Sequence, residues 1–163
     1  MSRRVSVVLL AAALSLPMGA HASKAAKPAP SPALATELLA RDFRLVPTLA
    51  DLPASVRLAL ASYTAKAPVA DPGQPWDATK VSNPPRPRHR LRLMGYTDGA
   101  AFVLYEHAGR KAHDHLVLMS VKDGTLAVTY DCHVDAKGKV DLPKLRALAR
   151  TGCEPGGEHG ETD

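Results

Sequence analysis

Three side chains that commonly bind metal ions lie close together in the sequence. Glu106 precedes a predicted turn at residues 109–110, and His113 and His115 follow it. Residues separated by one position project from the same face of a strand, so His113 and His115 share a face, and the turn places Glu106 opposite His113 on that face. Two imidazoles and one carboxylate form a ligand set that zinc accepts, with a fourth position left for water. The sequence therefore predicts a zinc or copper site of Glu106, His113 and His115.

Two observations favour a simpler role for these residues. The neighbouring His107 is predicted to point to the opposite face of its strand, and the chain has no His-Glu-x-x-His motif. Histidines near the tip of a hairpin are also common without a bound ion. A structural or solvent-exposed role is the alternative interpretation, and with it the protein needs no cofactor.

The same segment allows an acid–base site. Glu106 and His113 could serve as a base and an acid, and Arg90 or Arg92 could supply a cation. Strand alternation, however, places both arginines on the face opposite Glu106. The chain also has no Gly-x-Ser-x-Gly motif and no glycine-rich phosphate loop. A small secreted hydrolase is therefore an alternative, and a non-catalytic protein is the leading expectation.

The N-terminus has the three parts of a secretory signal peptide. Arg3 and Arg4 give a basic start, an apolar run covers residues 5–18, and residues 20–22 read Ala-His-Ala, a pattern typical of cleavage sites. The apolar run is shorter than the roughly 20 residues that span a bilayer. We therefore predict cleavage after Ala22 and a periplasmic or secreted protein with no membrane span. The absence of isoleucine and the abundance of alanine and arginine are typical of a GC-rich bacterial genome.

The predicted mature chain is small and weakly basic. Cleavage leaves 141 of the 163 residues, enough for one domain, and lowers the net charge from +5 to +3. This small excess does not favour nucleic-acid binding, which concentrates positive charge on one face. In an oxidising compartment the two cysteines, Cys132 and Cys153, predict a disulfide. Closing its loop of about 22 residues would stabilise the fold by roughly 3 kcal/mol.

Prolines divide the chain into its predicted segments. Proline is favoured at the first helical position and disfavours helix at the residue before it, so it predicts where helices begin and end. The predicted segments are a signal peptide over 1–22, a flexible leader over 23–30, a single domain over 31–153 and a disordered tail over 154–163. Within the domain we predict helices over 31–46, 51–67 and 142–150 and a proline-rich loop over 68–88.

Asp-Gly pairs at 98–99 and 123–124 lie between runs rich in Val, Leu, Phe and Tyr, which is typical of hairpins. Two-residue loops there set Leu93 opposite Leu104, Met119 opposite Val128 and Val117 opposite Tyr130. We predict an α+β fold, in which two N-terminal helices and a C-terminal helix pack on one face of a four-stranded antiparallel β-meander. The predicted strands lie near 89–97, 100–107, 113–121 and 125–133.

The expected function is that of a small exported binding module, such as an inhibitor, an immunity protein or an envelope-associated protein. Its partner would be a protein or an envelope component, and the sequence does not predict an oligomeric state. The contact surface would combine the only tryptophan with the outer face of the sheet. This predicted surface comprises Trp76, Met94, Val103, Tyr105 and Leu118.

Overall fold

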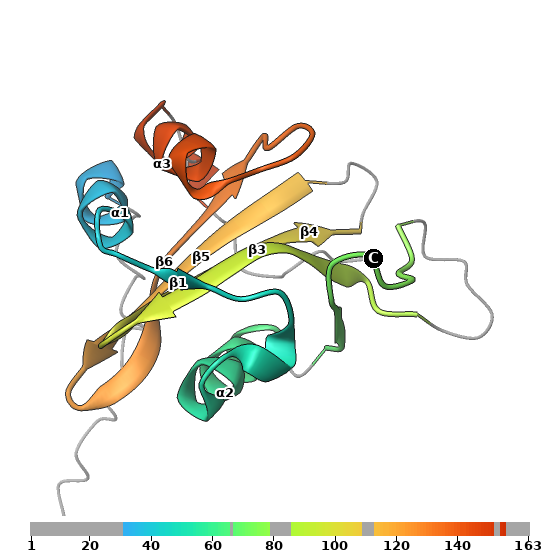
Figure 1. Ribbon diagram of the computed structural model, residues 1–163, viewed down its shortest axis with the longest axis horizontal. Coiled ribbons are helices and arrows are strands. Elements are labelled where there is room, and N and C mark those ends of the chain that lie inside the picture. The colour runs from blue at the N-terminus through green and yellow to red at the C-terminus, as the bar shows by residue number, and fades with distance from the viewer. Residues whose placement is uncertain (1–30, 66, 79–85, 109–112, 152–153, 156–163) are drawn as a thin grey trace, which may run out of the picture.

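A computed structural model describes residues 31–65, 67–78, 86–108, 113–151 and 154–155. Within these residues the chain forms one mainly antiparallel sheet with helices on both of its faces (Figure 1). The predicted α+β class with an antiparallel sheet is confirmed. The predicted signal peptide and flexible leader lie outside the described residues.

Four long strands form the centre of the sheet. Consecutive strands pair antiparallel, as the sequence predicts. Asp123 and Gly124 both have positive φ angles, +51° and +75°. This combination is typical of the type I′ turn, whose twist matches that of the flanking strands. The strands are β3 (His89–Thr97), β4 (Ala100–His107), β5 (His113–Lys122) and β6 (Thr125–Val134).

Three two-residue strands extend the sheet beyond the predicted four. β1 (Arg44–Leu45) pairs antiparallel with β3, β2 (Val69–Ala70) pairs parallel with β3, and β7 (Glu154–Pro155) pairs antiparallel with β6. β2 lies in the predicted proline-rich loop, and β7 lies in the predicted tail. Strands this short carry no periodic pattern, so the sequence could not indicate them.

The two N-terminal helices are shorter than predicted. They are α1 (Pro32–Leu39) and α2 (Ala54–Tyr63), with a 3₁₀ turn η1 (Leu49–Asp51) between them, and the third helix is α3 (Leu142–Thr151). The predicted helix over 31–46 ends at Leu39, and Phe43 beyond it packs edge to face against Phe102, with 5.0 Å between ring centroids. The chain then extends, and Arg44 and Leu45 pair with β3. No helix in the described part of the chain is long and apolar enough to cross a membrane.

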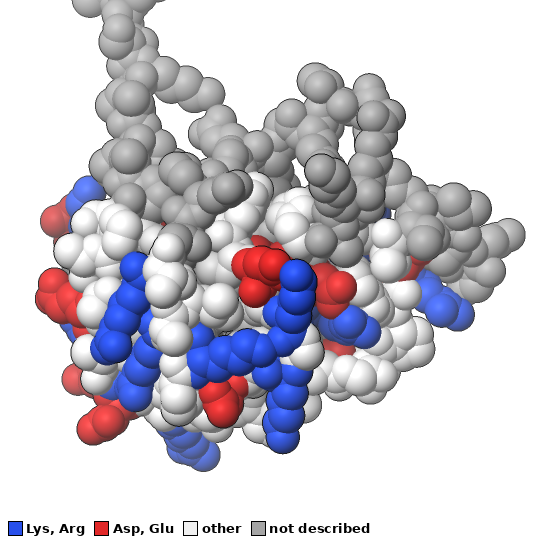
Figure 2. All heavy atoms as spheres, turned by 90° about the horizontal axis from the view of Figure 1, so that it is seen from above, with Lys and Arg blue, Asp and Glu red and all other residues white. Residues whose placement is uncertain are grey.

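Polar contacts hold α1 and α3 together. The Asp141 carboxylate accepts a hydrogen bond from the Lys144 backbone N–H at 2.9 Å, which caps the start of α3. Further along α3, the Arg146 guanidinium donates to the carbonyls of Leu39 at 2.7 Å and Arg41 at 3.0 Å. Lys and Arg side chains are prominent on this side of the molecule (Figure 2). The contacts of Arg146 satisfy carbonyls at the end of α1 that have no partner within the helix.

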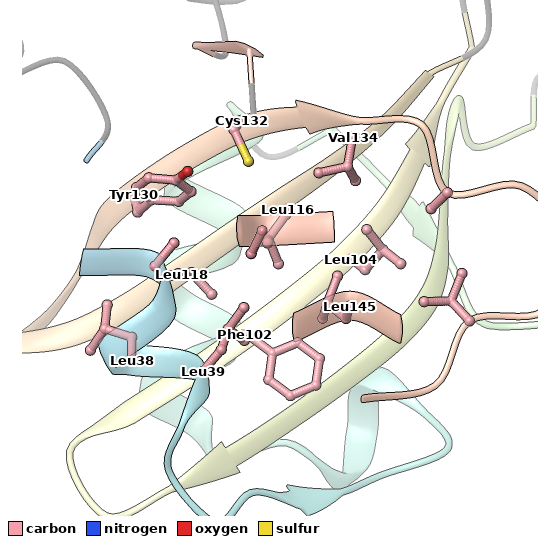
Figure 3. Close-up of a cluster of buried hydrophobic side chains, with 14 residues drawn as sticks. Leu38, Leu39, Phe102, Leu104, Leu116, Leu118, Tyr130, Cys132, Val134 and Leu145 are labelled. Carbon is pink, nitrogen blue, oxygen red and sulfur yellow. The ribbon is translucent and has the colours of Figure 1, made fainter. Parts of the chain in front are cut away.

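The sheet buries apolar side chains on both faces, so the prediction of a single covered face is wrong. The first cluster, under α1 and α3, includes Phe102, Leu104, Leu116 and Leu118 (Figure 3). The second cluster lies against α2 and contains Leu52, Val56, Leu60, Leu91, Met94, Ala101, Val103, Tyr105, Val117 and Met119. Consecutive residues of β4 and β5 are buried, as expected for strands covered on both sides.

Two irregularities in strand pairing decide which face each side chain meets. The predicted pairs Leu93–Leu104 and Met119–Val128 are confirmed. Between Leu118 and Met119 the register shifts, so Val117 pairs with Asp131 and the predicted pairing with Tyr130 is wrong. A second shift lies between Leu91 and Leu93. Because one extra residue exchanges the two faces of a strand, the predicted apolar face is divided between both clusters.

Candidate metal centre

The connection between β4 and β5 sets the composition of the candidate site. His107 pairs with His113, and Glu106 pairs with Asp114. The predicted pairing of Glu106 with His113 is therefore wrong by one residue. Such a shift moves a side chain to the other face of the sheet, so His107 and not Glu106 lies on the face of His113 and His115.

Three histidines of this face converge. One ring nitrogen from each of His107, His113 and His115 lies within 4.8 Å of the other two. The Nε2 atoms of His113 and His115 are only 2.9 Å apart, so one N–H donates a hydrogen bond to the other nitrogen. His107 and His113 are half-buried, and His115 is 2% exposed. The cluster therefore presents two partly accessible imidazoles and one that is held inside the protein.

Two further histidines flank this cluster and extend it across four adjacent strands. His89 on β3 stacks on His107, with 4.7 Å between ring centroids. His133 on β6 pairs with His115, and its ring centroid lies 4.4 Å from that of His115 and 4.5 Å from that of His113. We call these five residues the histidine row. The row crosses one end of the sheet, where β3 and β5 begin and β4 and β6 end.

A buried carboxylate orients the innermost histidine. The Nδ1 atom of His115 lies 3.3 Å from Oδ1 of Asp131, and both side chains are at most 3% exposed. The Tyr63 hydroxyl at the end of α2 donates a hydrogen bond to Oδ2 of the same carboxylate. A carboxylate at Nδ1 favours the tautomer that carries its proton there, which leaves the Nε2 lone pair for a ligand.

Two tyrosines lie beside the pair formed by His115 and Asp131. Tyr105 is fully buried and stacks on His115 at 5.0 Å and 6° between ring planes. Burial, reinforced by the charge of Asp131, raises the pKa of Tyr105 well above its usual range. Burial and the hydrogen bond to Asp131 raise the pKa of Tyr63 in the same direction. Both hydroxyls are therefore neutral at physiological pH.

Glu106 belongs to a different group of side chains. It forms an ion pair with Arg90 at 2.6 Å, and the two residues pair across β3 and β4. The predicted separation of Arg90 from Glu106 is therefore wrong. The guanidinium of Arg90 also lies 4.5 Å from the centroid of the Trp76 ring. Because His113 lies on the other face, the acid, base and cation of the hydrolase hypothesis do not meet. The second arginine of that hypothesis, Arg92, pairs with Asp114 at 2.5 Å.

Most of the predicted contact surface is inside the protein. Met94, Val103 and Tyr105 are fully buried against α2, and Leu118 is 1% exposed under α1 and α3. Only Trp76 is partly exposed. The prediction is wrong because the sheet is covered on both faces, whereas the sequence pattern was interpreted with one face exposed.

The predicted disulfide is described at one of its two ends. Cys132 is fully buried in the cluster under α1 and α3 (Figure 3). Its neighbours on β6, Asp131 and His133, project to the opposite face by strand alternation. Cys153 lies outside the described residues. The backbone that follows it pairs with β6, where Pro155 is the partner of Cys132. The disulfide stays a prediction.

Sequence reasoning placed His107 on the opposite face and did not single out Asp131, His133 or Tyr63. Alternation along residues 131–133 already places Asp131 and His133 on one face of their strand. The bulge before Met119 obscured the partner of Asp131. Tyr63 comes from a helix 68 residues away in the sequence, and no local pattern indicates such a contact.

The chain has no significant match among family models, curated proteins or solved structures. The function of the site must therefore be argued from the chemistry of its own side chains.

Proposed function

We propose that this protein binds a divalent transition-metal ion through His107, His113 and His115. The observation that carries the proposal is the convergence of three imidazole nitrogens within 4.8 Å on one face of the sheet. The carboxylate behind His115 supports it, since histidine ligands usually donate their second ring N–H to such a group.

The spacing of the nitrogens fits a tetrahedral ion. With metal–nitrogen bonds of about 2.0–2.1 Å, two ligands of a tetrahedral centre lie about 3.3 Å apart. The nitrogens of His113 and His115 are 2.9 Å apart, and none of the three is more than 4.8 Å from another. Small side-chain rotations would therefore suffice for coordination. The ion would replace the proton that His113 and His115 now share.

The donor atoms select the class of metal. Neutral imidazole suits Zn²⁺, Cu²⁺, Ni²⁺ and Co²⁺, whereas Mg²⁺ and Ca²⁺ prefer oxygen ligands. Among the side chains that the structure describes, Asp131 is the carboxylate beside the cluster, and it is held by His115 and Tyr63, which suits it to support a ligand. Copper would bind more tightly than zinc in such a site, and availability would decide which ion is carried.

Metal titration of the mature protein without an affinity tag tests the proposal. We expect one Zn²⁺ per chain by calorimetry, with binding abolished in the His113→Ala/His115→Ala double variant. Glu106→Gln is the matched control, because Glu106 lies on the opposite face and pairs with Arg90. The control should bind as the wild type does. No binding by the wild type, or equal binding by the double variant, would overturn the proposal.

We further propose that the metal-binding protein is exported, as its N-terminal sequence indicates. Export would place it where Cys132 and Cys153 can form their disulfide. A binding module that recognises a protein or an envelope component is compatible with this role, although the surface first assigned to it is buried. The ion would then be either its cargo or part of its recognition surface.

A further inference from the structure

We infer that His133 is the fourth ligand of this centre, so that four imidazoles enclose the ion and the protein retains it instead of using it for catalysis. This inference rests on the proposed metal site. The identity of the fourth ligand decides the kind of site: a fourth protein ligand closes it, whereas an open fourth position binds water or substrate.

The position of His133 carries the inference. It pairs with His115 across β5 and β6, so both side chains lie on the same face of the sheet. Its ring centroid is within 4.5 Å of both His113 and His115, the two residues whose Nε2 atoms already face each other. His133 is half-buried, like His107 and His113.

The other donors near the cluster are less suited to the fourth position. Asp131 is already engaged by His115 and Tyr63. The Tyr105 hydroxyl is buried and protonated, and a tyrosine binds metal as its anion. His89 stacks on His107 with 15° between their ring planes, at the end of the row away from His113 and His115. Among the described residues, His133 is the donor that touches both central ligands.

The chemical consequence is a change in the class of the site. A metal with three protein ligands keeps an exchangeable water and can activate it, whereas a metal with four holds no reactive water. Four imidazoles from the adjacent strands β4, β5 and β6 would form a carrier or sequestering centre. The site would then withhold the ion from other molecules in its compartment.

Cobalt substitution tests the number of ligands separately from the existence of the site. The visible spectrum of bound Co²⁺ depends on the identity of its ligands as well as on their number. His133→Ala should still bind one Co²⁺, but with a spectrum shifted from that of the wild type, because water replaces an imidazole. Its affinity should be lower by at least about tenfold, since even outer-shell changes cost that much. His89→Ala is the matched control from the other end of the row and should retain the spectrum.

The outcomes separate the two proposals. If the wild type binds neither Co²⁺ nor Zn²⁺, the proposed function fails, and this inference fails with it. If the wild type binds and His133→Ala keeps both the spectrum and the affinity, only the inference fails. Free imidazole should restore the wild-type spectrum to His133→Ala if the missing group is a ligand. If the variant does not fold, X-ray absorption of the zinc-loaded wild type counts the imidazoles directly: four support the inference and three overturn it.

Discussion

At the scale of single residues, Asp131 connects the histidine row to α2. Its two carboxylate oxygens serve different partners, Nδ1 of His115 and the hydroxyl of Tyr63. A buried carboxylate is costly unless its lone pairs are satisfied, and these two contacts supply the compensation. The same contacts fix the tautomer of His115. Asp131 is therefore a positioning residue for the proposed ligand and also part of the fold.

Replacing Asp131 with asparagine should weaken metal binding without removing it. The amide can still contact His115 but no longer supports the ligand with a negative charge, so we expect a loss of about 10- to 100-fold in zinc affinity. Competition against a coloured zinc chelator measures this. Asp135→Asn is the control, since Asp135 is exposed and pairs with Lys137. Equal affinity in Asp131→Asn and the wild type would show that the carboxylate does not act on the site.

Tyr63 should make the protein sensitive to alkaline pH. Burial and Asp131 raise the pKa of Tyr63 in the folded state above its unfolded value of about 10. The folded state then binds this proton more tightly, so the stabilisation is complete below pH 10 and is lost as the pH rises above it. Urea unfolding across this range should show the decline. In Tyr63→Phe the decline should be smaller, and stability at pH 7 should fall by about 1–2 kcal/mol.

Tyr96→Phe is the control for this measurement, because Tyr96 pairs with β1 near the end of β3 that lies away from the histidine row. An alkaline decline of the same size in Tyr63→Phe and the wild type would mean that other groups cause it.

At the scale of elements, the packing of β1 against β3 depends on a close approach at Gly95. A Cβ atom there would lie 2.8 Å from the Phe102 ring and 3.1 Å from the Leu45 side chain. Glycine therefore allows the edge strand and the aromatic ring to meet over the same backbone position. This contact helps to direct the chain from α1 toward the sheet, together with Phe43, which packs against the same ring.

Gly95→Ala should destabilise the fold by about 1–3 kcal/mol, because the added methyl group overfills a packed site. Thermal unfolding measures the loss. The double variant Gly95→Ala/Phe102→Leu should recover part of it, since the smaller side chain removes the nearest obstacle. Strictly additive losses in the two single variants would show that Phe102 is not the cause.

At the scale of the whole molecule, helices cover both faces of one sheet, and the histidine row crosses the end of the face that α2 covers. Apolar side chains under α2 occupy the middle of that face, while Tyr63 in its last turn reaches the row through Asp131. On the opposite face, Cys132 belongs to the cluster that α1 and α3 share. The predicted disulfide would therefore join the end of α3 to the strand that carries His133.

Loss of the disulfide should lower stability by about 2–4 kcal/mol. Cys132→Ser also places a polar atom in the buried cluster, so Cys153→Ser is the informative companion. If the bond forms, both variants should unfold at lower temperature, and the intact mature protein should be lighter than its reduced form by two hydrogen atoms. Normal stability of Cys153→Ser would show that Cys132 contributes through packing alone.

The sequence by itself determined the four long strands, the two Asp-Gly turns, the capped helix α3 and the presence of metal-binding side chains at the ends of β4 and β5. These features depend on neighbours within a few residues, through alternation, turn chemistry and capping. Only the tertiary structure decided which of those side chains meet. The pairing of His107 with His113, the bulge beside Met119 and the contact from Tyr63 to Asp131 all depend on packing between distant segments. A register shift of one residue moves every side chain of a strand to the other face of the sheet, at little cost in local interactions. The packing of apolar side chains on both faces therefore selects the register, and the register determines which side chains form the site.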